Sequence, residues 1–139
     1  MLVREVMTTN PVFARPDTTL RDVARLMTEN DCGGIPICDD GGIIGLITDR
    51  DLACRGFTQG LNPLDIPARY VMTARVVSIA ENETLDRAVQ IMSDAGVGRL
   101  PVLRNGRLIG IVSSSDIVEH VADQKAAQLA RRTSHPRQS

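Results

Sequence analysis

The sequence lacks the features by which several common classes of protein are recognised. No run approaches about 18 apolar residues, and the first residues, MLVREVMTTNP, contain no apolar stretch like that of a secretory signal. The net charge is −1 and no long basic run is present, so bulk charge gives no reason to expect a nucleic-acid partner. We therefore expect a soluble cytoplasmic protein that binds neither membranes nor nucleic acids.

Cysteine and histidine are scarce. The three cysteines, Cys32, Cys38 and Cys54, form no CxxC pair, and an odd number argues against a disulfide framework or a zinc site. We expect them to be small buried apolar residues in a reducing compartment, with no metal site.

Patterns that carry catalysis are missing as well. The sequence has no HExxH, Walker loop, GxGxxG or set of Ser, His and Asp at motif spacing. His120 has no carboxylate partner at such a spacing, and Asp39 and Asp40 share a turn, where solvated carboxylates are ordinary. We therefore predict that the chain is not an enzyme and has neither catalytic residues nor a catalytic cofactor.

What the sequence does contain is an internal repeat with an offset of 65 residues. Val6-Met7-Thr8 recurs as Val71-Met72-Thr73, and the register holds without a gap from residues 4 and 69 through residues 51 and 116. Glycines, prolines and apolar positions keep this register together, so coincidence is a poor explanation. Only two copies fit, which excludes a long solenoid.

Each copy is predicted to follow the order β-α-β-β-α. A short extended piece (11–13 or 76–78) precedes a helix with apolar residues at i, i+3, i+4 and i+7, capped by Asp17 or Thr18 in copy one and by Asn82 in copy two. Two hairpins follow, 35–38 with 43–47 and 100–103 with 108–112, and Asp-Gly and Asn-Gly mark their turns. A second helix starts near Thr48 and near Ser113, and the later one, reaching about residue 132, is the longer.

The repeat predicts an α+β fold of two small domains, residues 1–60 and 61–132, with a linker at about 56–68 and a disordered tail at 133–139. One copy alone would be marginally stable, and the chain has no Trp, one Tyr and two Phe to cover an apolar sheet face. We therefore expect the copies to pack sheet against sheet about a pseudo-two-fold axis. Exposed apolar helix faces further suggest a homodimer.

The element order, the strands GIPI and GRLPV, and the pair GLITDRD and GIVSSSD resemble the cystathionine β-synthase domain, or CBS domain. Two in tandem resemble the CBS pair, or Bateman module, of small stand-alone bacterial proteins, from residue 1 to about residue 123. The resemblance implies a non-catalytic regulatory module that binds an adenine nucleotide between its domains. The ligand would be AMP, ADP or ATP, with NAD or S-adenosylmethionine as further candidates, and an unknown effector protein would receive the signal. The alternative is a ligand-free dimerisation or interaction scaffold that regulates a partner protein.

The segments Thr48-x-x-Asp51 and Ser113-x-x-Asp116 have two interpretations. A hydroxyl at a helix start can contact a phosphate, and a carboxylate there can accept two hydrogen bonds from a ribose cis-diol. In proteins similar to this one, these residues do so for adenosine nucleotides. The same spacing is also a capping box, which holds a helix start without any ligand. The sequence leaves both interpretations open.

The resemblance also implies a pocket for the base, formed by backbone near Val12 and Val77 and by the starts of two strands, where glycine lets a ligand approach closely. The strand-start residues are Gly33, Gly34, Ile35, Pro36, Gly98, Arg99, Leu100 and Pro101. The counterpart of Arg99 is Gly34, so the two sites are not equivalent. The guanidinium of Arg99 can reach a phosphate or lie solvated at the surface, and Arg50, whose counterpart is Ser115, poses the same choice.

Overall fold

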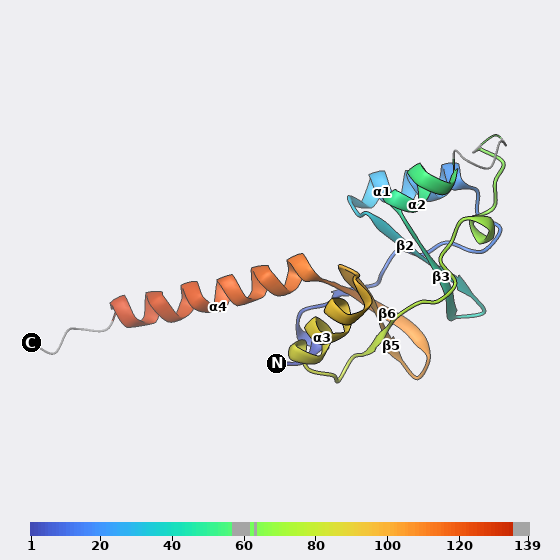
Figure 1. The fold of residues 1–139 in the computed structure, drawn as a ribbon. Helices are drawn as coiled ribbons and strands as arrows, with labels where there is room; N and C mark the ends of the chain where they lie inside the picture. Colours follow the sequence, from blue (N-terminus) through green and yellow to red (C-terminus); the bar gives the residue numbers. More distant parts are fainter. Residues whose placement is uncertain (57–61, 63, 135–139) are drawn as a thin grey trace, which may run out of the picture.

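The computed structural model describes residues 1–56, 62 and 64–134, and it is a mixed structure of helices and sheet, as expected (Figure 1). The short elements are the 3-10 helices η1 (Val3–Glu5) and η3 (Ala68–Tyr70), the strands β1 (Thr8–Thr9) and β4 (Ile79–Ala80), and α2 (Asp49–Asp51) with the π-helical η2 (Leu52–Gly56). The longer ones are α1 (Leu20–Asn30), β2 (Gly34–Asp39), β3 (Gly42–Thr48), α3 (Leu85–Ala95), β5 (Arg99–Arg104), β6 (Arg107–Ser113) and α4 (Ser114–Ser134). The predicted disordered tail and part of the predicted linker, residues 57–61, 63 and 135–139, lie outside the described residues.

Helices α1 and α3 occupy equivalent places in the two copies, and each buries the apolar residues at i, i+3 and i+7 of the predicted stripe. The i+4 residues, Ala24 and Val89, are exposed, so the predicted stripe is wrong at that position. The predicted caps of both helices are wrong by one or two residues. Thr19 and Thr84 are the caps, and each hydroxyl accepts a hydrogen bond from the backbone N–H three residues on, at 3.3 and 3.1 Å. Thr18 is already used in the preceding turn, where its hydroxyl accepts from the backbone N–H of Arg15 at 2.9 Å. The hydroxyl of Thr18 thus serves the turn, and that of Thr19, directly before Leu20, serves the helix.

The two predicted hairpins, β2–β3 and β5–β6, are confirmed as antiparallel pairs. Their turns hold two successive residues at positive φ, 52° and 83° for Asp40 and Gly41 and 52° and 79° for Asn105 and Gly106. This is the tight turn that Asp-Gly and Asn-Gly favour. Both predicted extended pieces form their pairings slightly later than expected. The piece predicted at 11–13 makes only an isolated parallel bridge, from Ala14 to Ile37, and the piece predicted at 76–78 forms its strand as β4, which pairs in parallel with β5.

Hydrogen bonds join the two copies. Gly42 in β3 pairs with Arg107 in β6, which links the hairpins into one path in the order β2-β3-β6-β5-β4. Strand β1 crosses to pair with β6, and Thr73 makes the equivalent bridge to Leu46 in β3. In each copy, the segment before the long helix therefore pairs with the hairpin of the other copy, which is consistent with a pseudo-two-fold relation.

The two hydrophobic cores follow this crossing. One core contains α1 and the β2–β3 hairpin but also Ile66, Ala68 and Val71, which come from the start of the second repeat. The other contains α3 and the β5–β6 hairpin but also Val3, from the start of the first. The predicted boundary at residue 60 thus does not separate the residues of one core from those of the other, although the domain limits themselves stay a prediction.

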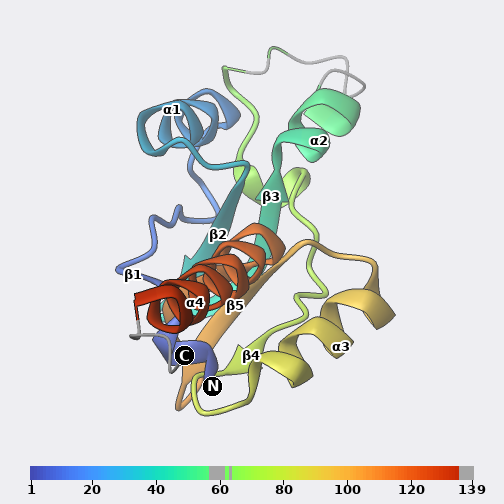
Figure 2. The ribbon, with the colours of Figure 1, turned by 90° about the vertical axis from the view of Figure 1, so that its left-hand side faces the viewer.

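Helix α4 has 21 residues and extends well beyond the body of the molecule (Figure 1). Viewed nearly along its axis, it lies in front of the strands (Figure 2). Ile117 is buried, whereas every residue from 121 to 132 is exposed. Among the helices in the described part of the chain, none combines the length and apolar character needed to cross a membrane.

Candidate functional site

The two Ser/Thr-x-x-Asp segments both form capping boxes. In copy one, the Thr48 hydroxyl accepts from the backbone N–H of Asp51 at 3.2 Å, and the Asp51 carboxylate accepts from the backbone N–H of Thr48 at 2.9 Å. In copy two, the distances between Ser113 and Asp116 are 3.0 and 3.2 Å. The capping interpretation therefore holds at both positions. Each carboxylate spends one oxygen, Oδ2, on the cap, which leaves its other oxygen for a second partner.

The second oxygen has different surroundings in the two copies. Oδ1 of Asp51 lies 3.7 Å from a guanidinium nitrogen of Arg55, one helical turn on. The residue equivalent to Arg55 is His120, and no cation pairs with Asp116 in the part of the chain that the structure describes. Copy two also begins the 21-residue α4 at this point, whereas α2 has three residues before the π-helical turn. The acidic group of copy two is therefore better placed to accept hydrogen bonds from a ligand.

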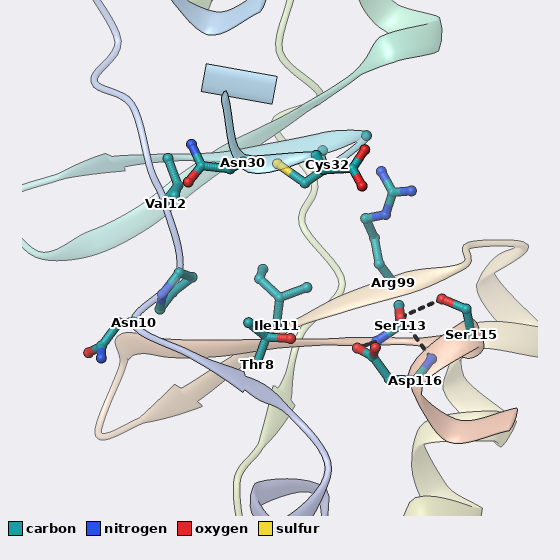
Figure 3. Close-up of a pocket in the computed structure, with 14 residues that line it drawn as sticks. Thr8, Asn10, Val12, Asn30, Cys32, Arg99, Ile111, Ser113, Ser115 and Asp116 are labelled. Carbon is teal, nitrogen blue, oxygen red and sulfur yellow. Dashed lines mark hydrogen bonds between the residues drawn. The ribbon is translucent and has the colours of Figure 1, made fainter. Parts of the chain in front are cut away.

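A pocket of about 430 Å³ lies over the carboxylate of copy two (Figure 3). Copy one supplies the wall made by Val12, Gly33 and Gly34, and copy two supplies Ser113 and Asp116. The Ser113 hydroxyl lies 2.9 Å from the Ser115 hydroxyl, so two hydroxyl groups stand beside the start of α4. The remaining lining residues are Thr8, Asn10, Pro11, Asn30, Asp31, Cys32, Arg99 and Ile111. We call this the larger pocket.

A second pocket, of about 160 Å³, occupies the pseudo-symmetric place over copy one; we call it the smaller pocket. Each of its lining residues stands 65 positions from a residue that lines the larger pocket, for example Thr73 from Thr8 and Val97 from Cys32. It is lined by Leu46, Thr48, Asp51, Thr73, Arg75, Val76, Val77, Val97 and Arg99. The duplication thus produces two pockets, but they differ in size and in their charged groups. A third depression, of about 450 Å³ and more open to solvent, continues from Asp31 and Cys32 onto α1, so the names larger and smaller compare only the two pseudo-symmetric pockets.

The predicted site residues fall into two groups. The larger pocket brings together Val12, Gly33, Gly34, Arg99, Ser113 and Asp116, and the smaller one Thr48, Asp51, Val77 and Arg99. The others line neither of these pockets. Four strand residues are fully buried in the cores, namely Ile35, Pro36, Leu100 and Pro101.

Gly98 and Arg50 also lie outside the two pockets. The carbonyl of Gly98 accepts from the backbone N–H of Ser114 at 2.8 Å, so it helps to anchor the start of α4. Arg50 is exposed, and its backbone N–H donates to the Asp49 carboxylate at 2.8 Å. Several lining residues were not predicted, among them Thr8, Asn10 and Cys32. The sequence offered a signal for them, because the offset relates Thr8 and Asn10 to Thr73 and Arg75, close to Val77, and Cys32 directly precedes Gly33.

The cysteines do not share one environment. Cys38 is buried, and burial raises the pKa of its thiol, whereas Cys32 is half-buried and Cys54 is exposed. The expectation of three buried cysteines is therefore wrong for Cys54, which lies on the outer side of η2. Within the described ranges, no group of three or more His, Cys, Asp and Glu side chains is arranged to hold a metal ion.

Comparison with known proteins places these features in a family. The CBS domain model matches residues 3–55 and 68–123. The CBS domain-containing protein YhcV of Bacillus subtilis is 33% identical over 134 residues, covering 96% of this chain and 95% of the relative. Hypoxic response protein 1 of Mycobacterium tuberculosis is 30% identical over 134 residues, covering 96% and 94%.

Two solved structures extend the comparison. The crystal structure of Hypoxic Response Protein I with two coordinated zinc ions superposes with a TM-score of 0.80 at 31% identity, covering 86% of this chain and 98% of that one. The CBS domain pair of protein MJ0100, in complex with 5′-methylthioadenosine and S-adenosyl-L-methionine, gives a TM-score of 0.80 at 25% identity, covering 89% and 98%.

Proposed function

Because the chain belongs to the CBS domain family and carries two tandem copies, we propose that it is a regulatory module whose larger pocket binds an adenine nucleotide. AMP, ADP and ATP are the first candidates, and NAD and S-adenosylmethionine are further ones. The related CBS pair of MJ0100 was crystallised with two adenosyl compounds, which supports a ligand of this class.

The observation that carries the proposal is the carboxylate of Asp116 in a pocket of adequate size. Pockets for small ligands measure about 300–1,000 Å³, and the larger pocket, at about 430 Å³, falls in this range. Asp116 is held in place by its cap, while its second oxygen has no cation beside it among the described residues. A ribose cis-diol can donate to that oxygen, and the apolar side chains of Val12, Pro11 and Ile111 offer a surface for a base.

The start of α4 suits a phosphate. The dipole of a helix favours negative charge at its first turn, and the hydroxyls of Ser113 and Ser115 stand at the same end. The smaller pocket is less suitable, since about 160 Å³ is below the range for such ligands and Asp51 is already paired with Arg55.

A ligand in the larger pocket would touch both copies, because Val12 and Gly34 belong to one and Ser113 and Asp116 to the other. Such a ligand favours whichever relative arrangement of the copies fits it best and shifts the population toward it. We propose that this shift, without any chemical step, is what a partner protein in the cytoplasm recognises.

Titration calorimetry of the full chain with AMP, ADP, ATP and NAD tests the proposal. We expect a saturable heat with at least one of them, and a thermal shift that follows the same order. A ligand present at about 100 times its Kd adds about 2.7 kcal/mol of stability. If no adenosine compound bound, the ligand-free scaffold would be the better account.

One observation favours the scaffold as a second role. Val118 and Val121 are 67% and 40% exposed on α4, and the helix continues with eleven more exposed residues. Isolated helices shorter than about 12–15 residues are marginally stable in water, and the exposed part of α4, residues 121–132, is of this order. Contact with another surface would therefore stabilise α4. We propose that two copies of the chain associate through this face, which is compatible with ligand binding.

A further inference from the structure

Arg99 is the residue that the larger and the smaller pocket have in common. Its backbone belongs to copy two, where it opens β5 and pairs with Ser113. Its side chain extends toward copy one, on the side of the larger pocket where Cys32 lies (Figure 3). One guanidinium thus stands at the boundary between two pseudo-symmetric sites.

The Arg99 side chain can extend toward copy one because the equivalent position there is a glycine. A Cβ atom built on Gly34 would lie 2.6 Å from Nη1 and 3.0 Å from Cδ of Arg99. A Cβ on the preceding Gly33 would lie 3.2 Å from Nη2 of the same side chain. The arginine therefore occupies the space that side chains at 33 and 34 would fill.

The charges nearby leave the guanidinium available. In the described ranges Arg99 makes no ion pair and no side-chain hydrogen bond, although Asp49 reaches the same space above Gly33. It is also the cation among the residues that line the larger pocket, where Asp31 and Asp116 carry negative charge. A phosphate entering between those carboxylates needs a positive partner, and a guanidinium supplies a fork of donors.

We propose, on the basis of the nucleotide function above, that Arg99 makes the larger pocket specific for phosphorylated adenosine ligands over uncharged adenosyl compounds. Because one guanidinium serves both pockets, the chain binds one such ligand, not two. The smaller pocket has Arg75 as a second cation, but its volume of about 160 Å³ suits a small anion better than a nucleotide.

Calorimetric titration of the full chain with AMP and with adenosine tests this specificity. We expect one AMP per chain, with an affinity roughly ten- to hundredfold above that for adenosine, as charged hydrogen bonds give. Arg99→Gln should remove this preference while adenosine affinity stays the same, and Arg99→Lys should retain part of it. Arg87→Gln, an exposed arginine on α3, is the matched control and should bind AMP as the unaltered chain does.

Gly34→Ala provides a second variant that keeps every charge. The three atoms nearest to the added methyl group all belong to the Arg99 side chain, the closest at 2.6 Å, so the arginine must move. We expect a reduced preference for AMP over adenosine without loss of the fold, as judged by circular dichroism.

Three results would overturn the specificity inference and leave the proposed function intact. They are equal affinity for AMP and adenosine, two equivalent AMP molecules per chain, or a loss of AMP preference in Arg75→Gln but not in Arg99→Gln. If adenosine and all of AMP, ADP, ATP and NAD failed to bind, this would instead remove the proposed function, and the inference that rests on it.

Discussion

Replacing Asp116 by alanine separates the two interpretations of the Ser/Thr-x-x-Asp segments when it is compared with Asp51→Ala. Both substitutions remove a carboxylate that accepts one backbone N–H at the start of a helix, at 3.2 and 2.9 Å. Each loses about 0.3–1.5 kcal/mol of capping free energy. Asp51→Ala also loses the ion pair with the half-exposed Arg55, which contributes less than about 1 kcal/mol in water. Asp51→Ala should thus destabilise the fold at least as much as Asp116→Ala.

Ligand affinity should follow the opposite order. Of the two capping carboxylates, only that of Asp116 lies in the larger pocket, with an oxygen that a ribose can use. Losing hydrogen bonds to a charged group costs about 1.5–3 kcal/mol, which raises the Kd for AMP roughly ten- to hundredfold. Asp51→Ala should leave that Kd essentially unchanged.

The assay combines urea unfolding with calorimetric titration of AMP on the unaltered chain and on both variants. Unfolding reports the cap, and titration reports the ribose contact. Equal loss of affinity in the two variants, or no loss in either, would refute the assignment of the ribose site to Asp116. A loss confined to Asp51→Ala would move the site to the smaller pocket.

Three other outcomes follow from the packing. Gly110→Ala should lower the free energy of unfolding by about 1–3 kcal/mol in urea, since its Cβ would lie 2.9 Å from the backbone carbonyl oxygen of Thr8, which cannot rotate away. The hydrogen bond from Arg104, at 2.9 Å, and its charge lower the pKa of Glu81, so this pair stabilises the fold above the unfolded pKa of Glu81 and the stability is lost as pH falls through the folded pKa. Glu81→Gln should therefore be less stable at neutral pH and indistinguishable in strong acid, as thermal unfolding across pH would report, and a constant difference would contradict this account. Val118→Glu should shift sedimentation toward the monomer while AMP affinity persists, and an unchanged sedimentation coefficient would argue against association through α4.

The sequence was sufficient for the two long helices α1 and α3 and for both hairpins, because short-range signals decide these elements. The Asp-Gly and Asn-Gly turns need only their own backbone conformation, and both hairpins formed where these pairs predict them. The helix caps were misplaced because neighbouring Thr18 and Thr19 are equally good candidates by type. The structure distinguishes them because the Thr18 hydroxyl bonds to Arg15 in the preceding turn. Capping propensities depend on residue type alone and do not include this contact.

The crossing of segments between copies could not be predicted in this way. The offset shows that Val3 and Ala68 are equivalent, but not that each packs in the core built mainly by the other repeat. Both arrangements bury the same apolar residues and keep the same register. Only the three-dimensional path of the chain distinguishes them.

The residues of the candidate site could be predicted better than the difference between its two pockets. The repeat and the family resemblance identified both carboxylates and Arg99, and the structure places them at two unequal pockets. A signal for the inequality was present in the sequence, since Asp51 is followed by Arg55 at i+4 and Asp116 by His120. The volumes of the pockets depend on side-chain packing and have no counterpart in a sequence pattern.

The exchange of Val3 and Ile66 between the two cores has a consequence for any attempt to study half of the molecule. A fragment cut near residue 60 would keep the β2–β3 hairpin and α1 but would lose Ile66, Ala68 and Val71 from its core. It would also expose Val3, which packs in the other core, to water. Two halves that share their cores in this way should unfold together in a single transition. A substitution that destabilises one pocket should therefore lower the unfolding temperature of the whole chain.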